Sequence, residues 1–205
     1  LLTLPLFLFV ASYHFGKEDS NFEKFKKTKL IGLCFFFKGS IVILAPLIFH
    51  TEETLKIFEI LGVQLKIANI DILFILLALS LLSNIFIDNN TKFYLLDWIT
   101  VLILNIIFFP LVAFTIYFCF LHSVRHSLSL IYELNKNNFK KGFKDFIKKA
   151  LPLTMITAVL YLFVAFLLTN SYSLDDAILK VIFIGLASLT FPHILLEYLL
   201  EKNEK

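Results

Sequence analysis

The stretch that decides the fold is PLVAFTIYFCFLHSVRHSLSLIYE, residues Pro110–Glu133, an apolar run long enough to cross a bilayer. Its second half carries His122, Arg125 and His126. On a helix the two histidines lie at i and i+4, so both imidazoles project from one face, one turn apart. One helix can thereby offer two ligands to a single metal ion. Because ionisable groups at membrane depth are unfavourable, the cluster predicts a functional site rather than a helix end that reaches the lipid headgroups.

The composition indicates a membrane protein that crosses the bilayer several times. The chain has 205 residues, of which 59% are hydrophobic, and its mean hydropathy is +0.83. Soluble domains average about 45–50% apolar residues, and the excess here is too large for a soluble core. The net charge of +3 does not indicate nucleic-acid binding. Cys34 and Cys119 lie inside apolar runs and fit neither a disulfide framework nor a zinc-site spacing.

Seven apolar segments have roughly the length that a bilayer requires, about 17–25 residues. We therefore expect an all-α helical bundle that forms a single domain over residues 1–205. The chain begins at Leu1 inside the first segment, so we also expect an N-terminal part to be missing. Pro110 separates two adjoining segments and favours a tight helical hairpin over one kinked helix. The segments lie near 1–16, 30–49, 68–87, 93–109, 110–133, 150–169 and 176–200.

The lysines between these segments predict the orientation in the membrane. The stretches 17–29 and 134–149 hold most of the fourteen lysines on one side, whereas the alternate loops hold two, Lys56 and Lys66. An excess of basic residues marks cytoplasmic loops. The sequence therefore predicts a multi-pass protein of the cell inner (plasma) membrane, with the fourteen lysines in the cytoplasm.

This orientation predicts which histidines share a depth. His14 lies near the cytoplasmic end of its segment, and His122 and His126 lie about 18 and 24 Å along theirs at 1.5 Å per residue. His193 lies about 25 Å along the last segment, which also runs inward. We expect a metal site in the cytoplasmic half with His14, His122 and His126 as ligands. His193 either binds the metal or orients a ligand.

His50 is expected to lie on the opposite face of the membrane, out of reach of that metal. Only a helix break at Gly39-Ser40 would bring it closer. We assign His50 to capping or ordering the turn that follows its segment. There Thr51 or Thr54 is expected to cap the amphipathic stretch 55–66.

Imidazoles without a thiolate suit an Fe(2+) site that binds O₂. Histidine ligands need a partner on the other ring nitrogen, and Glu18, Asp19 and Glu197 are candidates for it. The chain also contains 25 phenylalanines. An iron site among so many aromatic rings favours a long apolar substrate taken from the lipid bilayer.

Four sequence elements together resemble the Brp/Blh family of bacterial and archaeal membrane enzymes. They are Ser12-Tyr13-His14-Phe15-Gly16 with Asp19, Phe49-His50 followed by Glu52-Glu53-Thr54, His122-Ser123-Val124-Arg125-His126, and Pro192-His193. The resemblance implies a β-carotene 15,15′-dioxygenase that uses O₂ to cleave the central double bond and release two retinals. It implies non-haem iron on His14, His122 and His126, and a functional link to a retinal-binding rhodopsin. It also implies a further histidine in a PHGxxDH-like motif, which is not among these 205 residues.

Three other hypotheses remain open. A membrane desaturase or hydroxylase also uses the HxxxH spacing, but such enzymes typically carry adjacent histidine pairs, which this sequence lacks. A retinal-binding opsin could use Lys180 for a Schiff base, although this lysine lies near the outer end of its segment beside Asp175 and Asp176. Added retinal would then give a red-shifted visible band. A bis-histidine haem protein would instead show a Soret band.

Overall fold

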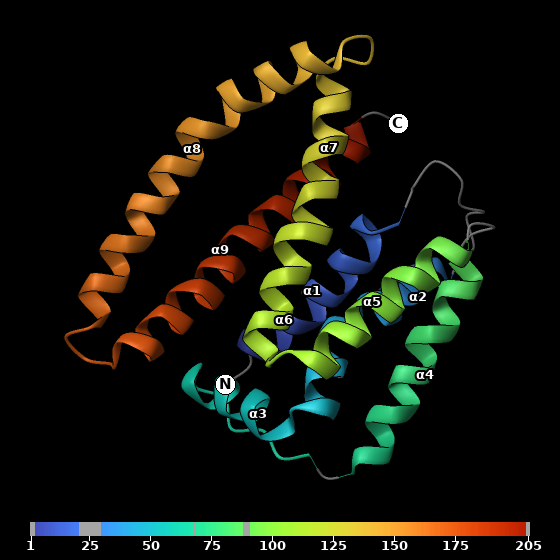
Figure 1. Cartoon of the computed structure of the whole chain (residues 1–205), viewed down its shortest axis with the longest axis vertical. Coiled ribbons are helices and arrows are strands. Elements are labelled where there is room, and N and C mark those ends of the chain that lie inside the picture. Colours follow the sequence, from blue (N-terminus) through green and yellow to red (C-terminus); the bar gives the residue numbers. More distant parts are fainter. Residues whose placement is uncertain (1–2, 21–29, 68, 88–90, 204–205) are drawn as a thin grey trace. The chain divides into compact units, whose positions relative to one another are not determined.

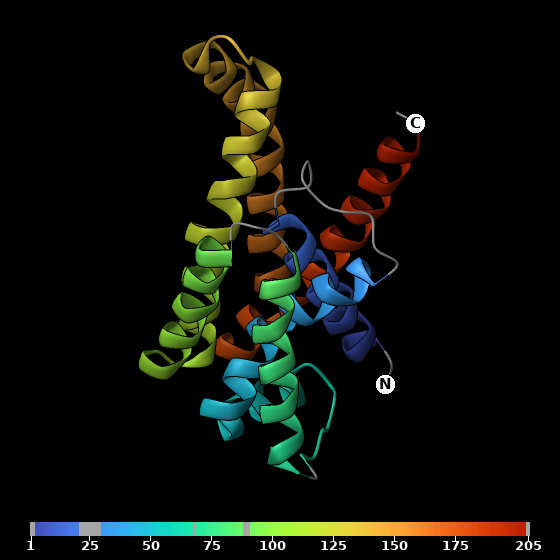
Figure 2. The ribbon, with the colours of Figure 1, turned by 90° about the vertical axis from the view of Figure 1, so that its right-hand side faces the viewer.

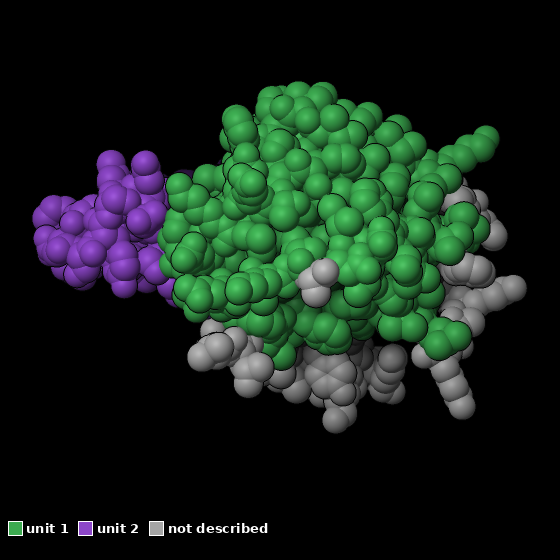
Figure 3. Space-filling view, turned by 90° about the horizontal axis from the view of Figure 1, so that it is seen from below, with its two compact units in different colours: residues 1–122 green, residues 123–205 purple. Residues whose placement is uncertain are grey.

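The computed structural model of the protein describes residues 3–20, 30–67, 69–87 and 91–203, without the side chains at positions 3, 86, 87, 91 and 191–203. Within these residues every regular element is a helix, which confirms the all-helical prediction (Figure 1). The chain divides into two compact units, residues 1–122 and 123–205, which Figure 3 colours separately.

Helix α2 is the centre of the first unit. It contacts α1, α3, α4 and α5, as the two ribbon views show (Figures 1 and 2). The core between these helices includes Phe15, Ile41 and Tyr117, all buried. The elements of the unit are α1 (Thr3–Glu18), α2 (Ile31–Phe49), α3 (Thr51–Ile60), α4 (Ile70–Ile87), α5 (Thr91–Ile107), α6 (Pro110–Ile116) and the π-helix η2 (Tyr117–His122).

Glycines allow α1 and α2 to cross with their backbones in contact. A Cβ atom on Gly16 would overlap the carbonyl oxygen of Phe35, and one on Gly39 would overlap the carbonyl oxygen of Ser12. Small residues four apart, such as Ser12 and Gly16, commonly mark a close crossing between membrane helices. The crossing fixes the C-terminal half of α1, which carries His14, against α2.

The second unit consists of α7 (Ser123–Leu134), α8 (Phe139–Leu168) and α9 (Leu174–Asn203). Helix α8 packs against both α7 and α9. Its start corrects the prediction that 134–149 is a loop. The Asn138 side chain accepts a hydrogen bond from the Lys141 backbone N–H at 3.1 Å, which caps the helix and starts it within the lysine-rich stretch. A high lysine content marks a side of the membrane but does not oppose helix formation.

Three helices of the described part of the chain are long and apolar enough to cross a membrane: Ile31–Phe49, Pro110–Leu134 and Phe139–Leu168. Ile70–Ile85 is a shorter apolar helix among the described residues. This is compatible with a membrane protein, whereas the predicted number of seven spans is not confirmed. The break at Pro110 is confirmed, because α5 ends at Ile107 and Pro110 occupies the first turn of α6.

Helix α2 runs without a break through Gly39 to Phe49, so the bend that could have redirected His50 is absent. The prediction that Thr51 or Thr54 caps a helix over 55–66 is wrong. Helix α3 already begins at Thr51, with no side-chain cap from His50. The Thr54 hydroxyl donates back to the His50 carbonyl at 2.7 Å, and the Thr51 hydroxyl donates to an α2 carbonyl. Both threonines therefore tie α3 to the end of α2.

The orientation can be checked with reporter fusions. A fusion after Lys149 should report the cytoplasm, because it follows a stretch rich in lysine. Fusions after Thr51 and Ser171 should report the exterior. An alkaline phosphatase and a fluorescent protein, which are active on opposite sides of the membrane, provide the measurement. A cytoplasmic signal at Thr51 would contradict the orientation and the shared depth of the histidines.

Candidate functional site

His122 lies at the end of a π-helical turn in the middle of the apolar helix Pro110–Leu134. In an α-helix, residues five apart point about 140° away from each other, since 3.6 residues complete a turn. The i→i+5 hydrogen bonding of a π-helix widens the turn, so Tyr117 and His122 approach one face. Both side chains reach the same carboxylate, that of Asp19. Single π-turns are frequent at functional sites.

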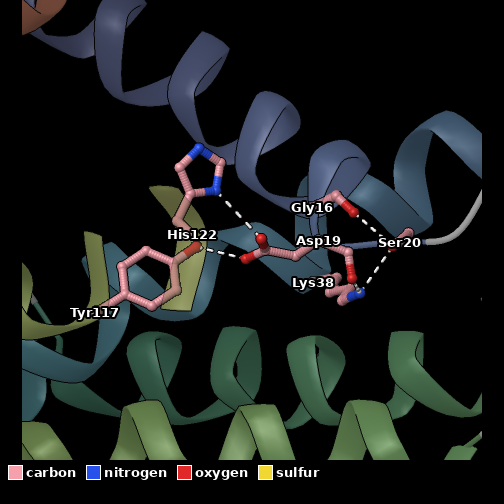
Figure 4. Close-up of polar contacts among 6 residues, drawn as sticks. All are labelled: Gly16, Asp19, Ser20, Lys38, Tyr117 and His122. Atoms are coloured by element: carbon pink, nitrogen blue, oxygen red, sulfur yellow. Dashed lines mark hydrogen bonds and ion pairs between the residues drawn. The ribbon is translucent and has the colours of Figure 1, made fainter. Parts of the chain in front are cut away.

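Asp19 joins the end of α1 to this turn (Figure 4). The Tyr117 hydroxyl donates to Oδ2 of Asp19 at 2.7 Å, and Nδ1 of His122 lies 3.2 Å from Oδ1. Only 13% of the Asp19 side chain and 8% of the His122 side chain are exposed. The carboxylate therefore holds two side chains of η2 in place from the turn that follows α1.

Hydrogen bonds and neighbouring charges keep Asp19 ionised. Burial raises the pKa of its carboxyl, but the hydrogen bond and charge of His122, the Tyr117 hydrogen bond and the charge of Lys38 together hold this pKa below its ordinary value. An ionised carboxylate only accepts hydrogen bonds, so Nδ1 of His122 must carry the proton. In the neutral ring Nε2 then keeps its lone pair. A carboxylate orients metal-binding histidines in the same way.

His14 faces the same turn from α1. Ser12 lies at the crossing with α2. His14 is two residues further along α1, about 200° around the helix, and therefore on the side away from that crossing. Its ring centroid is 5.7 Å from that of His122, with 70° between the planes, and both residues are buried. Two imidazoles on one ion, each bound at about 2 Å, place their centroids up to roughly 6 Å apart. The separation of the two ring centroids is therefore within the range for two imidazoles on one metal ion.

Aromatic rings pack around His122 of this pair. The Phe15 ring meets His122 edge-on at 4.9 Å, and the Phe118 ring stacks on it at 5.6 Å. Phe15 also contacts the Tyr117 ring at 5.6 Å. Such a lining excludes water and presents apolar surface to anything that approaches the histidines. The arrangement suits chemistry on an apolar molecule.

The structure brings together two of the four predicted ligands, His14 and His122. His126 lies on α7 and His193 on α9, both in the second unit, and the side chain of His193 falls outside the described residues. Within the described side chains, no three His, Cys, Asp or Glu residues are grouped closely enough to hold a metal. The four-histidine ligand set stays a prediction.

Asp19 is the sequence-predicted carboxylate that the structure pairs with a histidine, while the Glu197 side chain falls outside the described residues. Tyr117 could not be predicted as a partner of Asp19, because a spacing of five residues does not place two side chains on one α-helical face. Lys38, which contacts the turn after α1, was not predicted either. The one signal for this residue was a lysine inside an apolar segment.

The class that these features define is a helical protein with apolar helices of membrane-spanning length and a buried histidine pair, one member of which contacts a carboxylate. The chain belongs to the beta-carotene 15,15′-dioxygenase family, whose model matches residues 1–201. The resemblance found in the sequence motifs is thereby confirmed, and the family name indicates an oxygenase. The family match disfavours the opsin, desaturase and haem-protein hypotheses.

A curated relative shows how far this similarity extends. The chain is 29% identical over 201 residues to a protein named beta-carotene 15,15′-dioxygenase from uncultured marine bacterium 66A03. The match covers 95% of this chain and 70% of the relative. No solved structure matches the chain.

Proposed function

We propose that this protein cleaves the central double bond of β-carotene with O₂ in the inner membrane and releases two molecules of retinal. Both oxygen atoms of one O₂ then become the two aldehyde oxygens. The observation that carries the proposal is the buried His14–His122 pair, with His122 oriented by Asp19, in a chain of this family. The name of the curated relative supports the choice of substrate.

In this proposal His14, His122 and His126 hold Fe(2+), and His193 either joins them or orients one of them. When bound, Fe(2+) supplies a reduced centre at which O₂ reacts. The protein's own contribution is positional. Asp19 fixes the ring of His122 so that Nε2 faces away from the carboxylate, and Tyr117 holds the second oxygen of Asp19.

An apolar groove lies beside α1, on the side of that helix that carries Ser12 and away from His14. It has a volume of about 240 Å³ and is lined by residues of α1, α2 and α4, among them Phe9, Phe36 and Leu76. The hydroxyls of Ser12 and Ser40 line it too, but each donates to a carbonyl of its own helix. The groove therefore presents almost only apolar atoms and suits an apolar chain, but none of the four predicted ligands lines it. A retinal-binding rhodopsin would be a natural recipient of the product.

The test is expression of the full-length gene in cells that accumulate β-carotene. We expect the cells to lose colour and their extracts to contain retinal, identified by chromatography and mass spectrometry. Cells that keep their colour, with the protein present in the membrane and iron supplied, would contradict the proposed function. A red-shifted band after adding retinal to purified protein would favour the opsin hypothesis instead.

A further inference from the structure

Lys38 occupies a position where a charged side chain is unfavourable. It is the eighth residue of α2, one of the helices long enough to cross a membrane, and only 6% of it is exposed. A buried ammonium in an apolar helix persists only when nearby groups compensate for its lost hydration. Its contacts therefore indicate what it does.

The ammonium group of Lys38 binds the turn that ends α1 (Figure 4). Nζ donates to the backbone carbonyl of Asp19 at 2.6 Å and to the hydroxyl of Ser20 at 2.7 Å. That hydroxyl in turn donates to the carbonyl of Gly16 at 2.6 Å. Nζ also lies 3.9 Å from the centre of the Tyr94 ring. A cation at a helix C-terminus is favourable, because unpaired carbonyl groups concentrate partial negative charge there.

Two parts of Asp19 are therefore held from two directions. Lys38 fixes its backbone carbonyl, and the carboxylate of the same residue binds His122 and Tyr117. The Asp19–His122 contact of 3.2 Å is at the long end for a hydrogen bond, so a small shift of the turn would break it. The glycine crossing brings α2 close enough to α1 for Lys38 to reach the turn.

We propose that Lys38 is a positioning residue that holds the turn after α1, and through Asp19 sets the ring orientation and tautomer of His122. Its hydrogen bonds go to the Asp19 carbonyl and the Ser20 hydroxyl, so we expect its effect on metal binding to pass through the Asp19 carboxylate. The part of this inference that concerns iron rests on the proposed function. The part that concerns the tautomer of His122 does not.

The test compares Lys38→Met with a matched control. Methionine keeps an apolar stem of similar length but removes the charge and the donors. Lys180→Met is the control, because Nζ of Lys180 also lies over a tyrosine ring, that of Tyr172 at 4.6 Å, but on a helix of the second unit. Iron affinity should fall about tenfold in Lys38→Met, the low end of the loss seen when groups that orient metal ligands are removed. It should stay unchanged in Lys180→Met. Unchanged iron affinity in Lys38→Met would overturn the proposal.

A double substitution shows whether Lys38 acts through Asp19. If it does, Lys38→Met combined with Asp19→Asn should bind iron no more weakly than Asp19→Asn alone. If the double variant instead loses iron affinity by the product of the two single losses, Lys38 acts independently of Asp19 and this route is contradicted.

A measurement on metal-free protein separates this inference from the proposed function. With ¹⁵N-labelled histidine, the ring signals of His122, identified by their absence in His122→Ala, report which nitrogen carries the proton. We expect the Nδ1–H form in the wild type and a mixture in Lys38→Met. A tautomer that does not change would overturn the role of Lys38. If the wild type binds no iron, the proposed metal function fails while the tautomer result still decides this inference.

Discussion

Replacing His122 with alanine is expected to abolish iron binding and retinal formation while the protein stays in the membrane. His122 is the residue on which the Asp19 carboxylate, the His14 ring and the Phe15 ring converge. Loss of a group that only orients a metal ligand lowers metal affinity or activity by about 10–100-fold. Loss of the ligand itself should therefore exceed 100-fold. Elemental analysis of purified protein and retinal in extracts of carotene-accumulating cells measure the two effects.

His50→Ala is the matched control for this substitution. His50 lies at the junction of α2 and α3, with its ring 5.8 Å from that of Phe109, and is not a predicted ligand. The purified variant should keep its iron. His126→Ala should instead lose iron as His122→Ala does, because the resemblance and the HxxxH spacing both make His126 a ligand. Near-normal iron content in His122→Ala or in His126→Ala would contradict the assignment of that residue.

The second large effect is expected from Gly39→Ala. Its Cβ would overlap the carbonyl oxygen of Ser12 and crowd the backbone nitrogen of Gly16, and neither backbone atom can move without separating the two helices. Overpacking typically lowers the free energy of unfolding by about 1–3 kcal/mol, and contact between two backbones places this case at the upper end. The Lys38 contact with Asp19 should be lost as well, so iron affinity should fall together with stability. Unfolding by SDS in mixed micelles measures the stability.

Gly32→Ala is a control on the same helix. The nearest atom to its added Cβ would be a ring carbon of Tyr13 at 3.7 Å, an ordinary van der Waals contact. Alanine favours a helix by about 1 kcal/mol over glycine, so this variant should be as stable as the wild type or slightly more stable. Equal destabilisation by Gly32→Ala and Gly39→Ala would show that the crossing is not the reason for the glycine at position 39.

The sequence predicted the features that depend on local pattern. Pro110 could be recognised as the start of a helix, because proline has no N–H and suits the first helical turn. The apolar segments near 30–49 and 110–133 appear as candidate spans with nearly the same bounds. Asp19 was a candidate partner for a histidine because of its place in the chain, and the structure shows that it binds His122.

The features that were missed depend on long-range contacts or on small differences in helix geometry. A π-turn differs from an α-helix by a single register shift, and the YFCFLH sequence of η2 has no proline or glycine to mark it. The contacts of Lys38 could not be inferred because its partners lie 18 and 19 residues away, in the turn after α1. The start of α8 at Phe139 was obscured because the same lysines that indicate a cytoplasmic loop also suit an exposed helix.

The distance along the chain between Asp19 and its partners also sets an order of assembly during synthesis. Tyr117 and His122 follow Asp19 by 98 and 103 residues, whereas Lys38 follows it by only 19. At about 5–20 residues per second, the ribosome makes Lys38 within about 1–4 s of Asp19 but needs about 5–20 s to reach His122. During that interval Lys38 is already available to hold the backbone carbonyl of Asp19, and its charge acts on the carboxylate of the same residue. Helices α1 and α2 can thus enter the bilayer as a pair. This pair already holds Asp19, the hydrogen-bond acceptor for His122, before His122 is translated.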